Sequence, residues 1–240
     1  MLFLTAVQFL TRCPVPGWVG HSPAQLNAAV RYFPLVGVGV GGLGAAVFAL
    51  ARLGLPALPS ALLSLGATVL ATGAFHEDGL ADMCDGLFGG WTREDALRFM
   101  KDSRIGSFGA AGLFVMLALK AAATVTPGAI IAAHALSRLC AVGVIAALPY
   151  VRESEQGAKA KPVASGVGAT EVMVAGLCGV VPLLLLGWRG VVAALMAGAL
   201  TLVLARWFRR RLGGYTGDCL GGTQQVTEVA VLLVALWHAG

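Results

Sequence analysis

The sequence has few charged residues. Only 12% of its 240 residues are Asp, Glu, Lys or Arg, whereas 58% are hydrophobic. A soluble domain carries about 25% charged residues, so this chain could not keep a soluble surface hydrated. Its mean hydropathy is +0.81, and its 33 glycines suit close helix packing in lipid. We therefore expect an integral membrane protein.

Two common site patterns are also missing. The five cysteines stand singly, with no CxxC pair, which excludes a disulfide framework and a cysteine-based zinc site. The sequence contains no GxxxxGK[ST] pattern, so the chain has no P-loop. The net charge of +5 does not call for nucleic acid, because the basic loops of a membrane protein produce the same excess. We expect no nucleic-acid partner.

Seven stretches approach the roughly 20 apolar residues that a transmembrane helix needs. They are 33–53, 55–75, 105–125, 128–150, 171–188, 190–208 and 226–240, of which the last is short. The opening MLFLTAVQFLTR lacks the basic start of a signal peptide and is stopped by Pro14 and Pro16. We predict an all-α, polytopic membrane helix bundle of about seven spans, with an N-terminal interfacial or re-entrant helix, forming one domain over residues 1–240.

The distribution of basic residues predicts the orientation. Alternating spans place the N-terminus and the loops 76–104, 152–170 and 209–225 on one side of the membrane. Nearly all lysines and arginines outside the spans fall on that side, and only Arg52 and Arg189 fall on the other. By the positive-inside rule the first side is cytoplasmic, so the C-terminus is expected to face outward.

Seven of the twelve acidic residues lie between Glu77 and Asp102. Within FHEDGLADMCDG, a helix would present Asp78, Asp82 and Asp85 on one face, because they recur at i, i+4 and i+7. Such carboxylates repel one another unless a cation lies between them, and oxygen ligands select Mg²⁺, Mn²⁺ or Ca²⁺ over zinc. A solvated helix leaving the membrane would not explain the apolar residues between them. We predict a Mg²⁺-type site from which Glu77 points away.

Basic residues follow this acidic stripe in MKDSRIGSFG. Lys101 and Arg104 could neutralise phosphate oxygens, although the positive-inside rule alone would also place basic residues there. Arg138 lies inside a predicted span, where it needs a carboxylate or a substrate phosphate as partner. His134 lies one turn earlier on the same face and is given no role.

A glycine-rich loop is predicted in LGGYTGDCLGGTQQVTE. Glycine permits close approach of the backbone to a ligand. Asp218 in this loop falls on the predicted cytoplasmic side, as the acidic stripe does. It can therefore complete the metal site.

Taken together, these segments resemble one family, cobalamin synthase, the adenosylcobinamide-GDP ribazoletransferases. The matching segments cover nearly the whole chain in the family's order: FLTRCPVP, FPLVGVGVG, FHEDGLADMCDG, MKDSRIGSFG, Ser137-Arg138, and GGYTGDCLG followed by Glu228. The combination of HxDGLADxxDG with KDSRxG is highly specific. Glu77 departs from the pattern, because the family usually has an apolar residue there.

The resemblance implies a membrane-bound, Mg²⁺-dependent phosphotransferase of vitamin B12 biosynthesis. Its substrates would be adenosylcobinamide-GDP and α-ribazole or α-ribazole 5′-phosphate. Its products would be adenosylcobalamin or its 5′-phosphate, and GMP. The expected location is the cytoplasmic (inner) membrane of a bacterium, with the active site facing the cytoplasm. A homo-oligomer is compatible with the sequence but not specified by it.

We assign site residues on this basis. The expected metal ligands are Asp78, Asp82, Asp85 and Asp218. The expected catalytic carboxylates are Asp82, Asp85 and Asp102, one of which takes the proton of the attacking hydroxyl. The expected substrate and phosphate contacts are Lys101, Arg104, Arg138, Arg12, His76 and Lys161. The sequence does not choose among the three candidate bases.

Two other functions match parts of the sequence less well. Asp82 to Gly86 match the opening DxxDG of the CDP-alcohol phosphotransferases, but Gly89-Gly90 stand where that motif has Ala-Arg, and its later GxxxDxxxD is missing. A cation transporter would carry carboxylates at mid-depth in several spans. Here the spans after Asp102 are nearly free of acids.

Overall fold

The fold is all-α, as the sequence predicted. The computed structural model describes residues 1–20, 22–151 and 167–237, so Lys161 lies outside the described residues. Within those ranges the regular elements are helical, and the only β-type pairing is one isolated bridge between Tyr150 and Tyr215.

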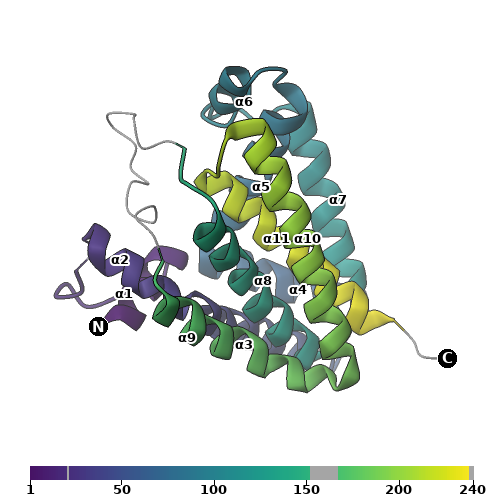
Figure 1. Cartoon of the computed structure of the whole chain (residues 1–240). Helices are drawn as coiled ribbons and strands as arrows, with labels where there is room; N and C mark the ends of the chain where they lie inside the picture. The colour runs from purple at the N-terminus through teal and green to yellow at the C-terminus, as the bar shows by residue number, and fades with distance from the viewer. Residues whose placement is uncertain (21, 152–166, 238–240) are drawn as a thin grey trace.

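The helices follow one another along the chain (Figure 1). Their bounds are α1 Leu2–Leu10, α2 Pro23–Ala29, η1 Val30–Tyr32, α3 Phe33–Ala51, α4 Ala57–Thr72, α5 Phe75–Cys84, η2 Asp85–Gly89, α6 Arg93–Phe99, α7 Ser107–Ala123, α8 Pro127–Ala147, α9 Ala169–Val180, η3 Val181–Leu186, α10 Trp188–Leu212 and α11 Gly217–Leu236. The predicted N-terminal helix is α1, which ends before Pro14 and Pro16.

The seven predicted spans all contain helix, but they are not equally long. In the described part of the chain, five helical segments are long and apolar enough to cross a membrane: Pro23–Ala51, Pro127–Ala147, Ala169–Leu186, Trp188–Leu212 and Gly217–Leu236. The bent pair of Ala57–Thr72 and Phe75–Gly89 would make a sixth, and Ser107–Ala123 is a shorter apolar helix. The polytopic bundle is therefore confirmed, whereas the count of seven is not.

A sharp break separates α4 from α5. The two axes differ by 92°, because Gly73 (φ 68°) and Ala74 (φ 58°) are both left-handed. Glycine adopts this conformation readily, whereas alanine does so at a cost. The Arg12 amide donates to Ala71 O (2.8 Å), and the Arg12 side chain packs over Gly73. The break turns the acidic helix α5 into the bundle.

α8 and α11 form the centre of the bundle. α8 packs on α3 and α11, and α11 also packs on α5, α7 and α10 (Figure 1). In their apolar windows, 78% of α8 and 72% of α11 is buried, against 17% of Ala169–Leu186 and 22% of α10. The last two segments therefore form the outer, lipid-facing layer, with exposed side chains such as Leu184 and Leu195.

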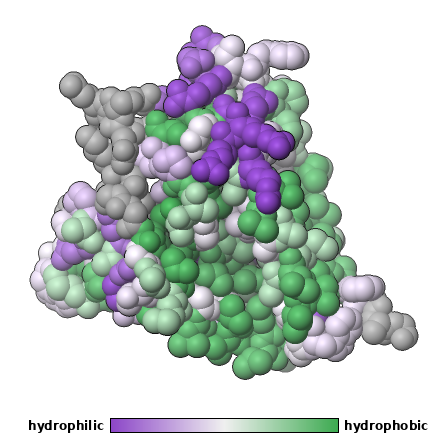
Figure 2. All heavy atoms as spheres, viewed as in Figure 1, coloured by the Kyte–Doolittle hydropathy of each residue, from purple (hydrophilic) through white to green (hydrophobic). Residues whose placement is uncertain are grey.

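The polar and apolar surfaces are separated. Figure 2 shows hydrophobic side chains over much of this face and hydrophilic ones gathered at the end that holds α6 and the end of α10. There the Arg93 Nε donates to Leu212 O (2.7 Å), and the Arg211 guanidinium donates to Gly90 O (2.5 Å). These bonds join the two basic segments that the sequence placed on one side of the membrane.

Candidate active site

The acidic helix α5 lies directly against the first turns of α11. A Cβ added to Gly79 would lie 3.1 Å from Gly221 Cα and 3.3 Å from Asp218 Cα. Only glycine allows two helix backbones to approach so closely. This contact brings Asp78 and Asp218 to one place, although they are 140 residues apart in the sequence.

Asp218 lies in a helix and not in a loop. The predicted glycine-rich loop and the predicted span from residue 226 were wrong in this respect, because α11 begins at Gly217. The Thr216 hydroxyl caps the helix by accepting from Cys219 N (3.3 Å). Two of the glycines that suggested a loop, Gly221 and Gly222, pack against α5.

A cavity of about 340 Å³ lies between α1, α3, α5, α8 and α11. Four of its lining residues were predicted for the site: His76, Asp78, Arg138 and Asp218. The remaining lining is mostly aromatic or aliphatic. The cavity thus brings two predicted metal ligands and two predicted phosphate contacts together.

Arg138 is the most deeply placed of these residues, with 2% of its surface exposed. Its Nη1 donates to His134 O (2.9 Å) and lies 3.1 Å from His134 Nδ1. Its Nε is buried without a hydrogen-bond partner. Gly37 of α3 makes room for it, because a Cβ there would lie 2.9 Å from Arg138 Cδ. Because the buried Nε–H of Arg138 has no acceptor among the described residues, a phosphate oxygen is a suitable partner for it.

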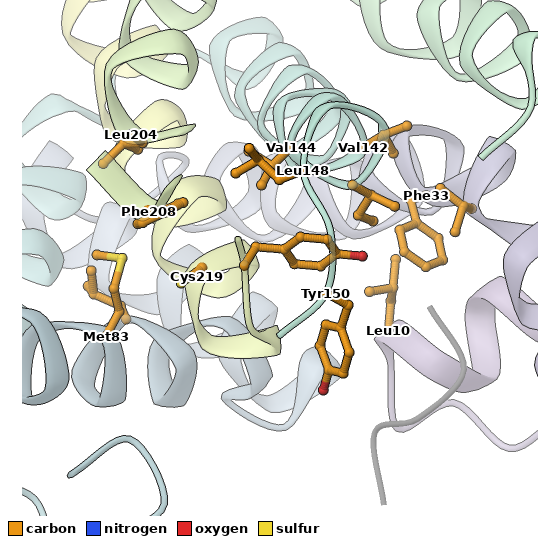
Figure 3. Close-up of a cluster of buried hydrophobic side chains, with 14 of the residues drawn as sticks. Leu10, Phe33, Met83, Val142, Val144, Leu148, Tyr150, Leu204, Phe208 and Cys219 are labelled. Carbon is orange, nitrogen blue, oxygen red and sulfur yellow. The ribbon is translucent and has the colours of Figure 1, made fainter. Parts of the chain in front are cut away.

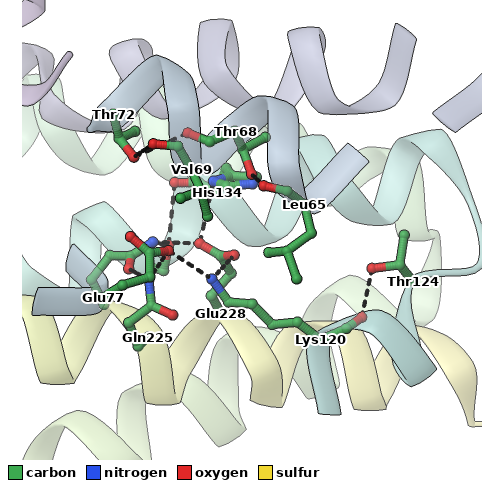
Figure 4. A network of polar contacts seen from close by, with 12 residues as sticks. Leu65, Thr68, Val69, Thr72, Glu77, Lys120, Thr124, His134, Gln225 and Glu228 are labelled. Atoms are coloured by element: carbon green, nitrogen blue, oxygen red, sulfur yellow. Dashed lines mark hydrogen bonds and ion pairs between the residues drawn. The ribbon is translucent and has the colours of Figure 1, made fainter. Parts of the chain in front are cut away.

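A buried polar network lies beside the cavity (Figure 4). Lys120 Nζ is 2.6 Å from Glu228 Oε1 and 3.7 Å from Glu77 Oε1. His134 Nδ1 is 3.2 Å from Glu228 Oε2, and Gln225 Nε2 donates to Glu77 Oε1 (2.9 Å). Charges at membrane depth are costly unless they are paired, and here each carboxylate has a buried partner.

This network contains what sequence reasoning missed. Glu228 was given no role from the sequence, although Arg138 lies in a predicted span, where it needs a carboxylate or a phosphate as partner, and Lys120 lies in another predicted span. Glu228, an acidic residue in the last span, was the available signal. The expectation that Glu77 points away from the acidic stripe is confirmed, because its carboxylate is held by Gln225 and Lys120.

Asp85 sits at a different place from Asp78. Its Oδ2 accepts from Gly106 N (2.7 Å) and its Oδ1 accepts from Gly109 N (2.8 Å). Both donors lie at the N-terminus of α7, where amides lack partners within the helix and attract negative charge. A Cβ on Gly106 would lie 2.4 Å from an Asp85 oxygen. Asp85 therefore holds the start of α7.

The KDSR segment lies at this second place. Arg104 Nη2 is 2.7 Å from Asp102 Oδ2, and Arg104 Nε donates to Asp102 Oδ1 (3.0 Å). These hydrogen bonds lower the pKa of the Asp102 carboxyl to about 2. Asp85, Asp102, Arg104 and Gly106 line an open cleft of about 500 Å³. Lys101 is exposed close by in sequence.

The structure therefore divides the predicted site. Asp78, Asp218, His76 and Arg138 line the cavity, whereas Asp85, Asp102 and Arg104 line the cleft. Asp82 lies between them on α5 and is half-buried, and Arg12 lies at the α4–α5 break. Among the described residues, no group of three or more His, Cys, Asp or Glu side chains is arranged to hold one metal ion.

Comparisons with known proteins agree along the whole chain. A family model described as cobalamin-5-phosphate synthase matches residues 2–236. Among curated relatives, the protein of Leptothrix cholodnii is 46% identical over 254 residues, covering 100% of this chain and 95% of its own. That of Shewanella frigidimarina is 46% identical, covering 98% and 94%, and that of Ralstonia pickettii is 49% identical, covering 95% and 92%. All three are named adenosylcobinamide-GDP ribazoletransferase. No solved structure matches.

Proposed function

The chain belongs to the cobalamin-5-phosphate synthase family and is a transferase, and on that premise we propose that it joins adenosylcobinamide-GDP to α-ribazole or its 5′-phosphate. The products are adenosylcobalamin or its 5′-phosphate, and GMP. The name shared by the relatives supports the donor and the transfer. The observation that carries the proposal is the meeting of Asp78, Asp218 and the buried Arg138 at one cavity.

The reaction is one substitution at phosphorus. A ring hydroxyl of the ribose attacks the phosphorus that carries the cobinamide linker, because the 5′-oxygen keeps its phosphate when the acceptor is α-ribazole 5′-phosphate. A new P–O bond forms, the bond to the bridging oxygen of the pyrophosphate breaks, and GMP leaves with that oxygen. Such a step depends mainly on positioning and on stabilising the charge of the transferring phosphoryl group.

The carboxylates in the cavity fit a magnesium ion. Mg²⁺ is usually held in proteins by one or two carboxylates, with substrate phosphates and waters completing its shell. Asp78 and Asp218 supply such a pair, and Asp82 follows Asp78 by one turn of α5. When bound, Mg²⁺ neutralises charge on the pyrophosphate oxygens. Because the substrate pyrophosphate supplies some of the oxygen ligands of the metal, the protein does not need to supply three of them.

Arg138 and His76 complete the phosphate contacts. The Arg138 Nε has no partner in the protein, so it can donate to a non-bridging phosphoryl oxygen. His76 is buried beside it at the cavity wall. Both side chains also border the polar network of Glu228, which fixes the guanidinium through His134.

Asp82 is the best of the three candidate bases. Asp85 has both oxygens fixed by the amides of α7. Asp102, with a pKa of about 2, has little tendency to take a proton near neutral pH. Asp82 lies on the same helix face as Asp78, and we assign it to receive the proton of the ribose hydroxyl.

The site is assigned to the cytoplasmic side of a bacterial inner membrane. The basic segments around Arg93 and Arg211 are joined at the end of the molecule that carries α6, and basic residues collect on the cytoplasmic side. A protease-protection assay on spheroplasts, with epitopes in the 92–104 segment and at the C-terminus, tests the orientation.

The decisive assay for the function is GMP release from adenosylcobinamide-GDP by purified protein. We expect GMP and a new cobamide in equal amounts, only when both α-ribazole and Mg²⁺ are present. Equal GMP release without an acceptor would identify a hydrolase. Turnover of a CDP-alcohol in place of the cobinamide donor would assign the chain to the other phosphotransferase class.

A further inference from the structure

Aromatic rings line much of the same cavity. Phe9 of α1 stacks on Phe33 of α3, with ring centroids 5.6 Å apart and planes at 11°. Phe75 of α5 meets the edge of Phe9 at 5.5 Å and packs against His76 at 5.3 Å. Three helices thus contribute one continuous aromatic wall, which ends at a residue assigned to the phosphate.

Two tyrosines form a second part of the lining. The rings of Tyr150 and Tyr215 are 5.4 Å apart, and Figure 3 shows Tyr150 in the buried cluster with Leu10 and Phe33. Their backbones are fixed, because Tyr215 N donates to Pro149 O and Val151 N donates to Tyr215 O, both at 3.0 Å. This bridge joins the end of α8 to the start of α11, so the rings are held in place before any ligand arrives.

The size of the cavity limits its occupant. At about 340 Å³ it lies at the low end of the roughly 300–1,000 Å³ found for small-molecule sites. That volume suits a nucleoside, but not a corrin ring with its amide side chains. The corrinoid part of the donor must therefore lie outside the cavity.

The residues that line the cavity favour one of the two heterocyclic bases in the substrates, which are the guanine of the donor and the dimethylbenzimidazole of the acceptor. Guanine, in the donor, carries several donors and acceptors on its edges, and burying them without partners is costly. The charged groups that line the cavity are those assigned to the metal and the phosphates. The dimethylbenzimidazole ring of α-ribazole is planar and largely apolar, so it gains from burial against aromatic rings and loses few hydrogen bonds.

Building on the proposed function, we propose that this aromatic cavity binds the base of the acceptor nucleoside. The bicyclic ring lies among Phe9, Phe33, Phe75, Tyr150 and Tyr215, and the reacting ring hydroxyl of the ribose points toward Asp78 and Asp218. The base of the acceptor, and not the guanine or the corrinoid of the donor, then occupies the aromatic part of the cavity.

A cavity-filling variant tests this assignment. Ala141 lies one turn after Arg138 on α8, is buried and lines the cavity, so Ala141→Leu takes space from the ring. We expect the KM for α-ribazole to rise roughly tenfold or more, with the KM for adenosylcobinamide-GDP unchanged. Ala146→Leu is the matched control, because Ala146 is exposed on the same helix, and it should leave both constants unchanged.

A smaller acceptor shows whether Ala141→Leu acts by filling the cavity or by disturbing the fold. The riboside of imidazole lacks the fused ring, so it should lose much less in Ala141→Leu than α-ribazole does. The milder Ala141→Val is measured in parallel, to provide a folded variant with a smaller shift of the same sign. Calorimetric titration of the wild-type protein with α-ribazole alone should show binding without the donor.

The outcomes distinguish this inference from the function itself. A wild-type protein that makes no cobamide with any acceptor contradicts the proposed function. If the wild type is active, a rise in the donor KM in Ala141→Leu places guanine or the corrinoid in the cavity and overturns the inference. Unchanged constants for both substrates in a folded Ala141→Leu also overturn it.

Discussion

The two ends of the acidic helix α5 carry the same residue type in different surroundings. At its start, Asp78 shares a largely apolar cavity with Asp218 and the buried Arg138. Beyond its end, Asp85 is held by two amides of α7 and Asp102 by Arg104, beside an open cleft. At the first place, carboxylates from two different helices meet the buried Arg138 guanidinium, so this place suits phosphoryl transfer. At the second place, Asp85 is bound by two amides of α7 and Asp102 by Arg104, so we expect these two carboxylates to have a structural role.

The largest effect is expected at the cavity end. Asp78→Asn and Asp218→Asn each remove a charge facing the pyrophosphate, so kcat for GMP release should fall by at least about 100-fold. Folding should change little, because neither aspartate is fully buried. Initial rates and thermal unfolding in detergent measure both. Either variant retaining more than a tenth of wild-type kcat at saturating Mg²⁺ would remove that residue from the metal site.

The next effect is expected in the buried network beside the cavity. Glu228→Gln leaves Lys120 without its closest carboxylate in a buried setting, and breaking a buried pair costs about 3–5 kcal/mol. The control is Glu94→Gln, since Glu94 is exposed with 78% of its side chain accessible, and such changes stay within about 0.5 kcal/mol. Denaturant unfolding in micelles compares them. Equal stability of the two variants would show that the network is not a source of stability.

A smaller effect is expected where Asp85 holds α7. Gly106→Ala places a Cβ against the Asp85 carboxylate, which should loosen the first turn of α7 at a cost of about 1–2 kcal/mol, as for loss of a helix cap. Hydrogen exchange should rise at the amides near Gly109, and kcat should fall less than in Asp78→Asn. Ser107→Ala, at an exposed neighbour, is the control. A larger kcat loss in Gly106→Ala than in Asp78→Asn would reverse the comparison.

The smallest effect is expected at Asp102. Arg104 lowers its pKa from 3.8 to about 2, so any stability from this pair is present above about pH 4 and is lost as pH falls toward 2. Because the pair is exposed, Asp102→Asn should unfold like wild type at pH 7 and keep roughly half or more of its activity. A pH–rate profile between pH 5 and 9 should keep its shape. A loss of kcat as large as that in Asp78→Asn, in a variant that still folds, would instead make Asp102 the general base.

The sequence predicted the residues of the site better than their grouping. The i, i+4, i+7 spacing predicted Asp78, Asp82 and Asp85 on one helix face; α5 contains Asp78 and Asp82, whereas Asp85 begins the next segment, η2. Spacing does not tell which neighbour each part of a face meets. That depends on α11 reaching Asp78 and on the start of α7 reaching Asp85, both set by long-range packing.

The start of α11 could not be read correctly from composition. The glycines around Asp218 indicate a loop in a soluble protein, but in a membrane bundle they also permit close helix contact. Gly221 serves the second purpose, because a Cβ there would lie 3.0 Å from Gly79 Cα. Similarly, a lysine inside a span needs a buried partner, but only the packing of α11 identifies Glu228 as the partner of Lys120.

The central claim is that the cavity end of α5 holds the reactive metal, and a change of metal preference at Asp218 tests it most directly. A thiolate favours softer cations than a carboxylate does, so Asp218→Cys should be nearly inactive in GMP release with Mg²⁺ and recover activity with Mn²⁺ or Cd²⁺. Wild type and Asp85→Cys, assayed with the same ions, should show no such recovery. Full activity of Asp218→Cys with Mg²⁺, or recovery in Asp85→Cys alone, would contradict the account.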